Sequence, residues 1–106
     1  MRISARALGA LAAATALAFP LLAQAEASDR QVRVWAASCA ACHGTDGHAQ
    51  PGMTSLAGRD ADELYNLLSE FKRDIRPATV MHQHAKGYTD EELKQLAQWF
   101  AAQPKR

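Results

Sequence analysis

Residues 35–53 have the sequence WAASCAACHGTDGHAQPGM, which contains both cysteines of the chain. Cys39 and Cys42 are separated by two residues, and His43 follows the second cysteine directly. In this Cys-x-x-Cys-His pattern, thiols on adjacent turns can bond to two vinyl groups at one edge of a porphyrin, and the following imidazole lies beneath the ring. The pattern predicts one covalent haem c attached through Cys39 and Cys42, with His43 as an iron ligand.

Three other interpretations of the cysteine pair compete with haem. A redox dithiol of the thioredoxin type is expected in a βαβ unit, and no strand pattern precedes this motif. A structural zinc site needs four ligands at paired spacings, and the chain has no second Cys-x-x-Cys or His-x-x-x-His pair. Spacing alone leaves a disulfide open, because exported proteins oxidise thiol pairs readily.

Three helices are expected, and each begins with a capping signal. Ser28, Asp60 and Thr89 are each followed three residues later by Gln or Glu. Apolar residues then recur at helical spacing, on the sets Val32, Trp35, Ala36 and Cys39; Leu64, Leu67, Leu68 and Phe71; and Leu93, Leu96, Ala97 and Phe100. The pattern predicts an all-α domain in which the cysteine motif ends the first packed helix.

Two long segments, 44–59 and 74–88, carry no periodic pattern. Irregular segments of this length are uncommon in a small domain unless they surround a ligand. The apolar residues outside the leader are rich in alanine and poor in valine and isoleucine. A bound haem would supply the missing apolar area, so folding is expected to depend on it.

The first 25 residues have the features of a secretory signal peptide. Arg2 and Arg6 precede an apolar run from Leu8 to Leu22, and Ala23-Gln24-Ala25 forms a small-x-small cleavage site. The run is shorter than the ~20 residues that span a bilayer. We expect export to the periplasm, cleavage near Ala25, no stable membrane insertion afterwards, and a mature monohaem domain at 26–106.

The charge of the mature domain is nearly balanced. Two of the twelve basic residues lie in the leader, so ten basic and eleven acidic residues remain, and the net charge is about −1. Nucleic-acid binding requires a basic surface that neutralises phosphates. The composition therefore excludes nucleic acid as a partner.

A second axial iron ligand must come from a distant part of the chain. Met81 lies 38 residues after His43 in the second irregular segment, where a returning chain could cross the far face of the ring. Met53 is only ten residues after His43, which is a strained distance. His82 and His84 could also bind the iron, and bis-histidine ligation would lower its potential. An open sixth position would instead suggest a peroxidase or a gas sensor.

Several residues could support the site. Pro51 could offer its carbonyl to Nδ1 of His43, as in many sites where a second group orients a metal-binding imidazole. His48 is expected at the surface. Possible partners of the haem propionates are Arg59, Arg76 and Lys86.

In the order CAACH, HGTDG, SLAGR, RPATVM and AKGYTDEELKQLAQWFAAQ, the chain resembles the class I c-type cytochromes over nearly all of residues 26–106. More narrowly, it is similar to the cytochrome subunits of flavocytochrome c sulfide dehydrogenases and to single halves of dihaem cytochromes. The resemblance implies a small fold in which the first and last helices cross near Trp35 and the Trp99-Phe100 pair. It also implies Cys39 and Cys42 as thioether anchors, and His43 and Met81 as axial ligands. The MHQH sequence, with two histidines close behind the methionine, departs from the family pattern.

The expected function is one-electron transfer by a His/Met-ligated haem, without catalysis, because both axial positions would be filled. Redox proteins such as a respiratory oxidase, a reductase or a flavoprotein dehydrogenase are the expected partners. The alternative is an electron-accepting subunit of a sulfide- or sulfur-oxidising flavoprotein complex.

Overall fold

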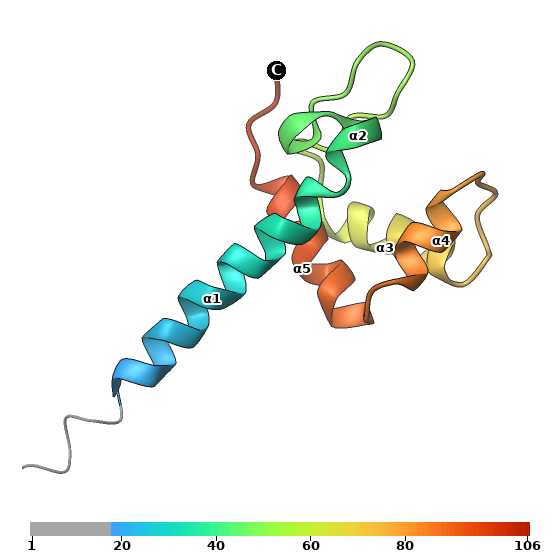
Figure 1. The fold of residues 1–106 in the computed structure, drawn as a ribbon. Coiled ribbons are helices and arrows are strands. Elements are labelled where there is room, and N and C mark those ends of the chain that lie inside the picture. The colour runs from blue at the N-terminus through green and yellow to red at the C-terminus, as the bar shows by residue number, and fades with distance from the viewer. Residues whose placement is uncertain (1–17) are drawn as a thin grey trace, which may run out of the picture.

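The computed structural model describes residues 18–106, with side chains from residue 28 onward, and this part of the chain is helical without strands. Figure 1 shows a long N-terminal helix that leads into a group of shorter helices. The all-α expectation is confirmed. The elements are α1 (Ala18–Ala37), α2 (Ala40–His43), the 3₁₀ helix η1 (Thr45–Gly47), α3 (Ala61–Lys72), α4 (Met81–Lys86) and α5 (Asp90–Ala101).

Helix α1 begins ten residues before the predicted cap at Ser28, so that expected helix start is wrong. The preceding segment is rich in alanine and leucine, which favour helix, and the helix runs through Ser28 without interruption. Residues 1–17 of the predicted signal peptide lie outside the described part of the chain, and cleavage near Ala25 stays a prediction. Among the helices described here, none has the length and apolar character needed to span a membrane.

The other two predicted helix starts are confirmed. The Asp60 carboxylate accepts a hydrogen bond from the Glu63 backbone N–H at 2.9 Å. Thr89 and Glu92 form a full capping box, in which each side chain accepts from the other residue's backbone N–H. These bonds satisfy amide groups that a helix leaves without partners at its first turn.

The core lies where α5 packs against both α1 and α3. Figure 1 shows α1 crossing α5 near the C-terminal end of α1. Trp35 packs on this core and meets the Tyr88 ring edge-on at 6.0 Å, while the Trp99 and Phe100 rings lie 5.0 Å apart. The implied crossing near these aromatic residues is therefore observed. The buried core consists of Ala36, Leu64, Leu93, Leu96, Ala97 and Phe100.

The segment predicted to be irregular at 74–88 contains α4, which that prediction missed. The helix has only six residues, and no side chain caps its first turn. A helix this short has little intrinsic stability, and most of it comes from packing. Here α4 packs on α3, and Ala85 is only 1% exposed. A local sequence pattern reveals neither this packing nor this burial.

Gly47 allows the loop after the cysteine motif to pass close to α5. Its backbone has φ of 80°, and its carbonyl accepts hydrogen bonds from Leu56 and Ala57. A Cβ atom at this position would lie 2.9 Å from both the Phe100 ring and the Ala57 nitrogen. The conformation and the lack of space both require glycine here.

We expect Gly47→Ala to lower the free energy of unfolding by roughly 1–3 kcal/mol more than Gly52→Ala does. Gly52 also has a positive φ, 93°, but a Cβ atom there would meet nothing within 4 Å. The two variants share the backbone strain, so their difference isolates the steric clash. Denaturant unfolding of both holoproteins measures it, and equal midpoints would contradict the close approach of this loop to α5.

Candidate haem-binding site

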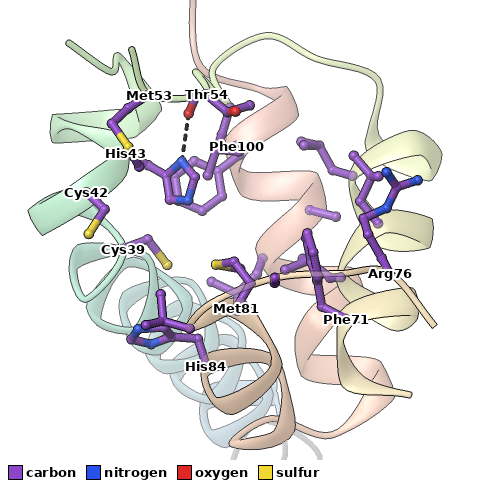
Figure 2. Close-up of a pocket in the computed structure, with 18 of the residues that line it drawn as sticks. Cys39, Cys42, His43, Met53, Thr54, Phe71, Arg76, Met81, His84 and Phe100 are labelled. Atoms are coloured by element: carbon purple, nitrogen blue, oxygen red, sulfur yellow. Dashed lines mark hydrogen bonds between the residues drawn. The ribbon is translucent and has the colours of Figure 1, made fainter. Parts of the chain in front are cut away.

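A cavity of about 560 Å³ opens between the cysteine motif, α3, α4 and α5. Its walls are mainly apolar, and Figure 2 shows side chains from all of these elements turned toward it. The predicted apolar face of α3 forms one wall, whereas Leu93 of α5 is fully buried in the helix core instead. The residues of the wall include Cys39, Cys42, His43, Leu64, Leu67, Leu68, Phe71, Met81, Leu96 and Phe100.

The cysteine motif forms a tight turn after α1. The Cys39 carbonyl accepts from the His43 N–H at 2.9 Å, which closes the single turn of α2. Figure 2 shows Cys39, Cys42 and His43 on the same side of the cavity. Both cysteines are free thiols, Cys39 partly buried and Cys42 exposed. Burial raises the pKa of the Cys39 thiol, and a hydrogen bond with Ser38 partly offsets this.

The part of the chain that the structure describes shows neither a disulfide nor a zinc site, whereas free thiols are equally what a reduced redox dithiol would have. The free thiols do not form the disulfide that spacing left open. Within residues 18–106, no group of three or more His, Cys, Asp or Glu side chains is arranged to hold a metal ion. A zinc site would need such a group.

The His43 imidazole is held in one orientation. Its Nδ1 lies 2.7 Å from the Thr54 carbonyl oxygen. A carbonyl can only accept, so Nδ1 carries the proton and Nε2 keeps a free lone pair. Figure 2 shows the ring directed into the cavity. This is the arrangement that orients metal-binding imidazoles in proteins.

Pro51 is not the acceptor, so that hypothesis is wrong. The Met53 N–H donates to the Gln50 carbonyl and closes a turn around Pro51. The carbonyl that accepts the hydrogen bond from His43 comes after this turn and belongs to Thr54. No sequence signal singles out Thr54, because a backbone carbonyl is available at every residue.

Met81 is the first residue of α4 and lines the cavity. Figure 2 shows its sulfur facing across the cavity toward the side that carries His43. Met53 also lines the cavity, but it lies beside His43 and is 48% exposed. The fold therefore brings Met81, and not Met53, to the side opposite His43.

The two histidines behind Met81 differ in their surroundings. His82 Nε2 donates to the Arg76 carbonyl at 2.5 Å, its Nδ1 is 3.9 Å from the Asp74 carboxylate, and its ring packs on Phe71. His82 does not line the cavity, whereas His84 does.

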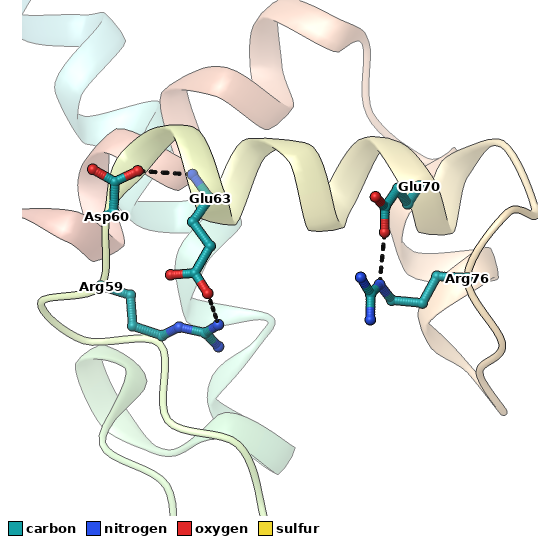
Figure 3. A network of polar contacts seen from close by, with 5 residues as sticks. All are labelled: Arg59, Asp60, Glu63, Glu70 and Arg76. Atoms are coloured by element: carbon teal, nitrogen blue, oxygen red, sulfur yellow. Dashed lines mark hydrogen bonds and ion pairs between the residues drawn. The ribbon is translucent and has the colours of Figure 1, made fainter.

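Two of the three predicted propionate partners lie at the cavity. Arg59 and Arg76 line it, and each forms an ion pair with a glutamate of α3, Glu63 and Glu70 respectively (Figure 3). Two cations are thus held beside an otherwise apolar wall, where ligand carboxylates could join them.

Lys86, the third candidate, does not line the cavity. It donates to both Asp74 oxygens, at 2.8 and 2.7 Å, and this hydrogen bond lowers the pKa of the Asp74 carboxyl. His48 also lies outside the cavity, and its Nε2 is 2.6 Å from the Pro104 carbonyl oxygen. His48 is partly buried and links the loop to the C-terminal segment, which its expected surface position did not indicate.

These residues fit an iron porphyrin. The apolar wall suits the macrocycle, and the volume is in the range of ligand-binding cavities. An oriented imidazole and a thioether are the donors found at low-spin cytochrome iron, and the two thiols lie on the same side of the cavity as the imidazole. The arrangement can hold a metal from two sides while its ring is bonded to the chain.

Comparison with known proteins agrees with this site. The family model described as "Cytochrome C oxidase, cbb3-type, subunit III" matches residues 26–100. The cytochrome subunit of sulfide dehydrogenase from Chlorobaculum tepidum is 44% identical over 63 residues, which are 59% of this chain and 57% of that protein. The thiosulfate dehydrogenase electron acceptor of Stutzerimonas stutzeri is 37% identical over 71 residues, 65% of this chain and 33% of that protein.

A third relative is matched over most of its own length. Cytochrome c-554(548) of Halomonas halodenitrificans is 31% identical over 70 residues, which are 62% of this chain and 84% of that protein. The chain spans only about half and a third of the first two relatives, so their complete activities do not transfer with the match. The matched region includes the cysteine motif, α3, α4 and nearly all of α5, and this chain therefore belongs to the cytochrome c family of haem-binding electron-transfer proteins.

Proposed function

We propose that this chain is an exported monohaem cytochrome that carries one electron at a time between redox proteins of the periplasm. Cys39 and Cys42 would form the two thioether bonds, and His43 and Met81 would bind the iron. When bound, the haem supplies a ferric/ferrous couple that gains or loses one electron. The observation that carries the proposal is the oriented His43 imidazole facing Met81 across an apolar cavity.

Ligation by both His43 and Met81 would make the protein a carrier and not a catalyst. The Thr54 carbonyl keeps the lone pair of His43 directed at the cavity. Met81 enters from α4 on the opposite side. With both positions occupied by the protein, a substrate finds no open coordination site. The enzymatic alternatives, a peroxidase or a gas sensor, would need the Met81 bond to be absent.

The apolar lining of the cavity would raise the redox potential of a bound haem. The cavity is lined mainly by apolar side chains, and around a bound haem such low polarity would favour the state with less charge at the iron. His/Met ligation raises the potential further relative to bis-histidine ligation. Both effects favour electron acceptance from a dehydrogenase.

A dehydrogenase partner is supported by the relatives, two of which are named for sulfide and thiosulfate dehydrogenases. The alternative function is therefore that of an electron-accepting subunit in a sulfide- or sulfur-oxidising flavoprotein complex. Two cavity residues, Val80 and Met53, are 52% and 48% exposed and could form part of a contact surface. Stable co-purification with a flavoprotein would favour the subunit, and a monomeric product would favour the free carrier.

The test is the mass and the absorption spectrum of the exported protein. We expect the mass of residues 26–106 plus one haem, which also tests cleavage near Ala25. The ferric protein should be low-spin and show the weak red band of iron–methionine sulfur charge transfer. The ferrous protein should not bind carbon monoxide. A mass equal to that of the polypeptide alone would refute covalent haem attachment. Carbon monoxide binding by the native protein would refute Met81 as the second iron ligand.

A further inference from the structure

Helix α4 presents two iron-binding side chains to the cavity. Met81 and His84 both line it, and His84 is three positions after Met81, which places them on the same face of a helix. Figure 2 shows both at the end of the cavity opposite His43. The proposed axial methionine thus has an imidazole one helical turn behind it.

The His84 ring is available for ligation. Its side chain is exposed at the edge of the cavity, and in residues 18–106 its ring nitrogens have no hydrogen-bond or ion-pair partner. Recruiting it to a metal would break no existing interaction of the imidazole. Neutral imidazole nitrogen is one of the commonest iron donors in proteins.

His82 is the natural comparison, since it has the same side chain on the same short helix. Its Nε2 donates to the Arg76 carbonyl, and its Nδ1 lies 3.9 Å from the Asp74 carboxylate. It also packs on Phe71 and does not line the cavity. The two histidines of the MHQH sequence therefore have different roles: His82 ties α4 to the preceding segment, and His84 is free.

We infer that His84 is a reserve axial ligand, which binds the iron on the Met81 side whenever the Met81 sulfur does not. This inference rests on the proposed haem between His43 and Met81. The exchange needs α4 to shift by about one turn, roughly 4.5 Å for three residues. The helix has six residues and no side-chain cap at its start, so its first turn is weakly held. The shift would have to break the packing of Ala85, the His82 bond to the Arg76 carbonyl and the Lys86 ion pair.

A reserve ligand would give the protein two states in which side chains fill both coordination positions of the iron, one with Met81 and one with His84. Bis-histidine ligation has a lower potential than His/Met ligation, so loss of the methionine bond would lower the potential. The iron would nevertheless stay six-coordinate. Small ligands would be kept from the metal, and the protein would remain an electron carrier.

The test uses the spin state and carbon monoxide binding of haem-loaded variants. Met81→Leu preserves apolar volume but removes the sulfur, and Met81→Ala is measured beside it in case leucine blocks the approach of the imidazole. We expect at least one of them to lose the red charge-transfer band, stay low-spin, exclude carbon monoxide and have a lower potential than the wild type. Adding His84→Ala should convert it to a high-spin protein that binds carbon monoxide.

The matched control adds His82→Ala to the same Met81 variant, and it should leave the low-spin spectrum unchanged. The inference is overturned if both Met81 single variants are high-spin and bind carbon monoxide. It is also overturned if the low-spin spectrum survives in the His84 double variant. A wild-type protein without haem or without the red band would instead refute the proposed function, so the two failures are distinguishable.

Discussion

Replacing Cys39 and Cys42 together by alanine is expected to yield a chain that has no covalent haem and is largely unfolded. The described part of the chain buries nine hydrophobic residues, of which four are alanine, and it contains a cavity of about 560 Å³. At ~24 cal/mol per Å³, an empty space of this size would cost up to roughly 13 kcal/mol. That upper bound, for a cavity closed to solvent, is comparable with the whole stability of a small domain.

Far-ultraviolet circular dichroism and the intact mass of the purified double variant test this expectation. The control is Cys42→Ala alone, which keeps the partly buried Cys39 thiol for one thioether bond and should remain folded with haem. A helical apoprotein with a cooperative thermal transition would show that the side chains suffice. Folding would then not depend on the haem.

Replacing His43 by alanine is expected to remove one axial ligand and abolish the low-spin spectrum. The imidazole is positioned by its 2.7 Å hydrogen bond to the Thr54 carbonyl, and no other histidine lies beside it in the cavity. Haem should stay attached, because the thioether bonds do not involve His43. The ferrous variant should therefore bind carbon monoxide, which the wild type is expected to exclude.

The control for this variant is His48→Ala. His48 follows His43 by five residues but lies outside the cavity, with Nε2 on the Pro104 carbonyl. It should lower stability slightly and leave the spectrum unchanged. A low-spin spectrum in His43→Ala would contradict the assigned ligand, and a changed spectrum in His48→Ala would contradict its placement outside the site.

Local sequence signals predicted the parts of the fold that depend on neighbouring residues. The caps at Asp60 and Thr89 are where the pattern placed them, because a cap involves residues only three apart. The apolar stripes of α3 and α5 do face the cavity and the core. The predicted helix start at Ser28 is wrong because the residues before it are also strong helix formers, and they extend α1 toward the N-terminus.

What the sequence by itself determined is that two thiols and an imidazole lie together, because Cys39, Cys42 and His43 are close in the chain and a tight turn is enough to bring them to one side of the cavity. Tertiary structure alone decided which distant groups complete it. The Thr54 carbonyl orients His43, Arg59 and Arg76 reach the cavity while Lys86 turns to Asp74, and α4 separates the roles of the two histidines behind Met81. These choices depend on how loops return to the core, and a residue's type does not reveal which of several equivalent groups the packed chain will bring into contact.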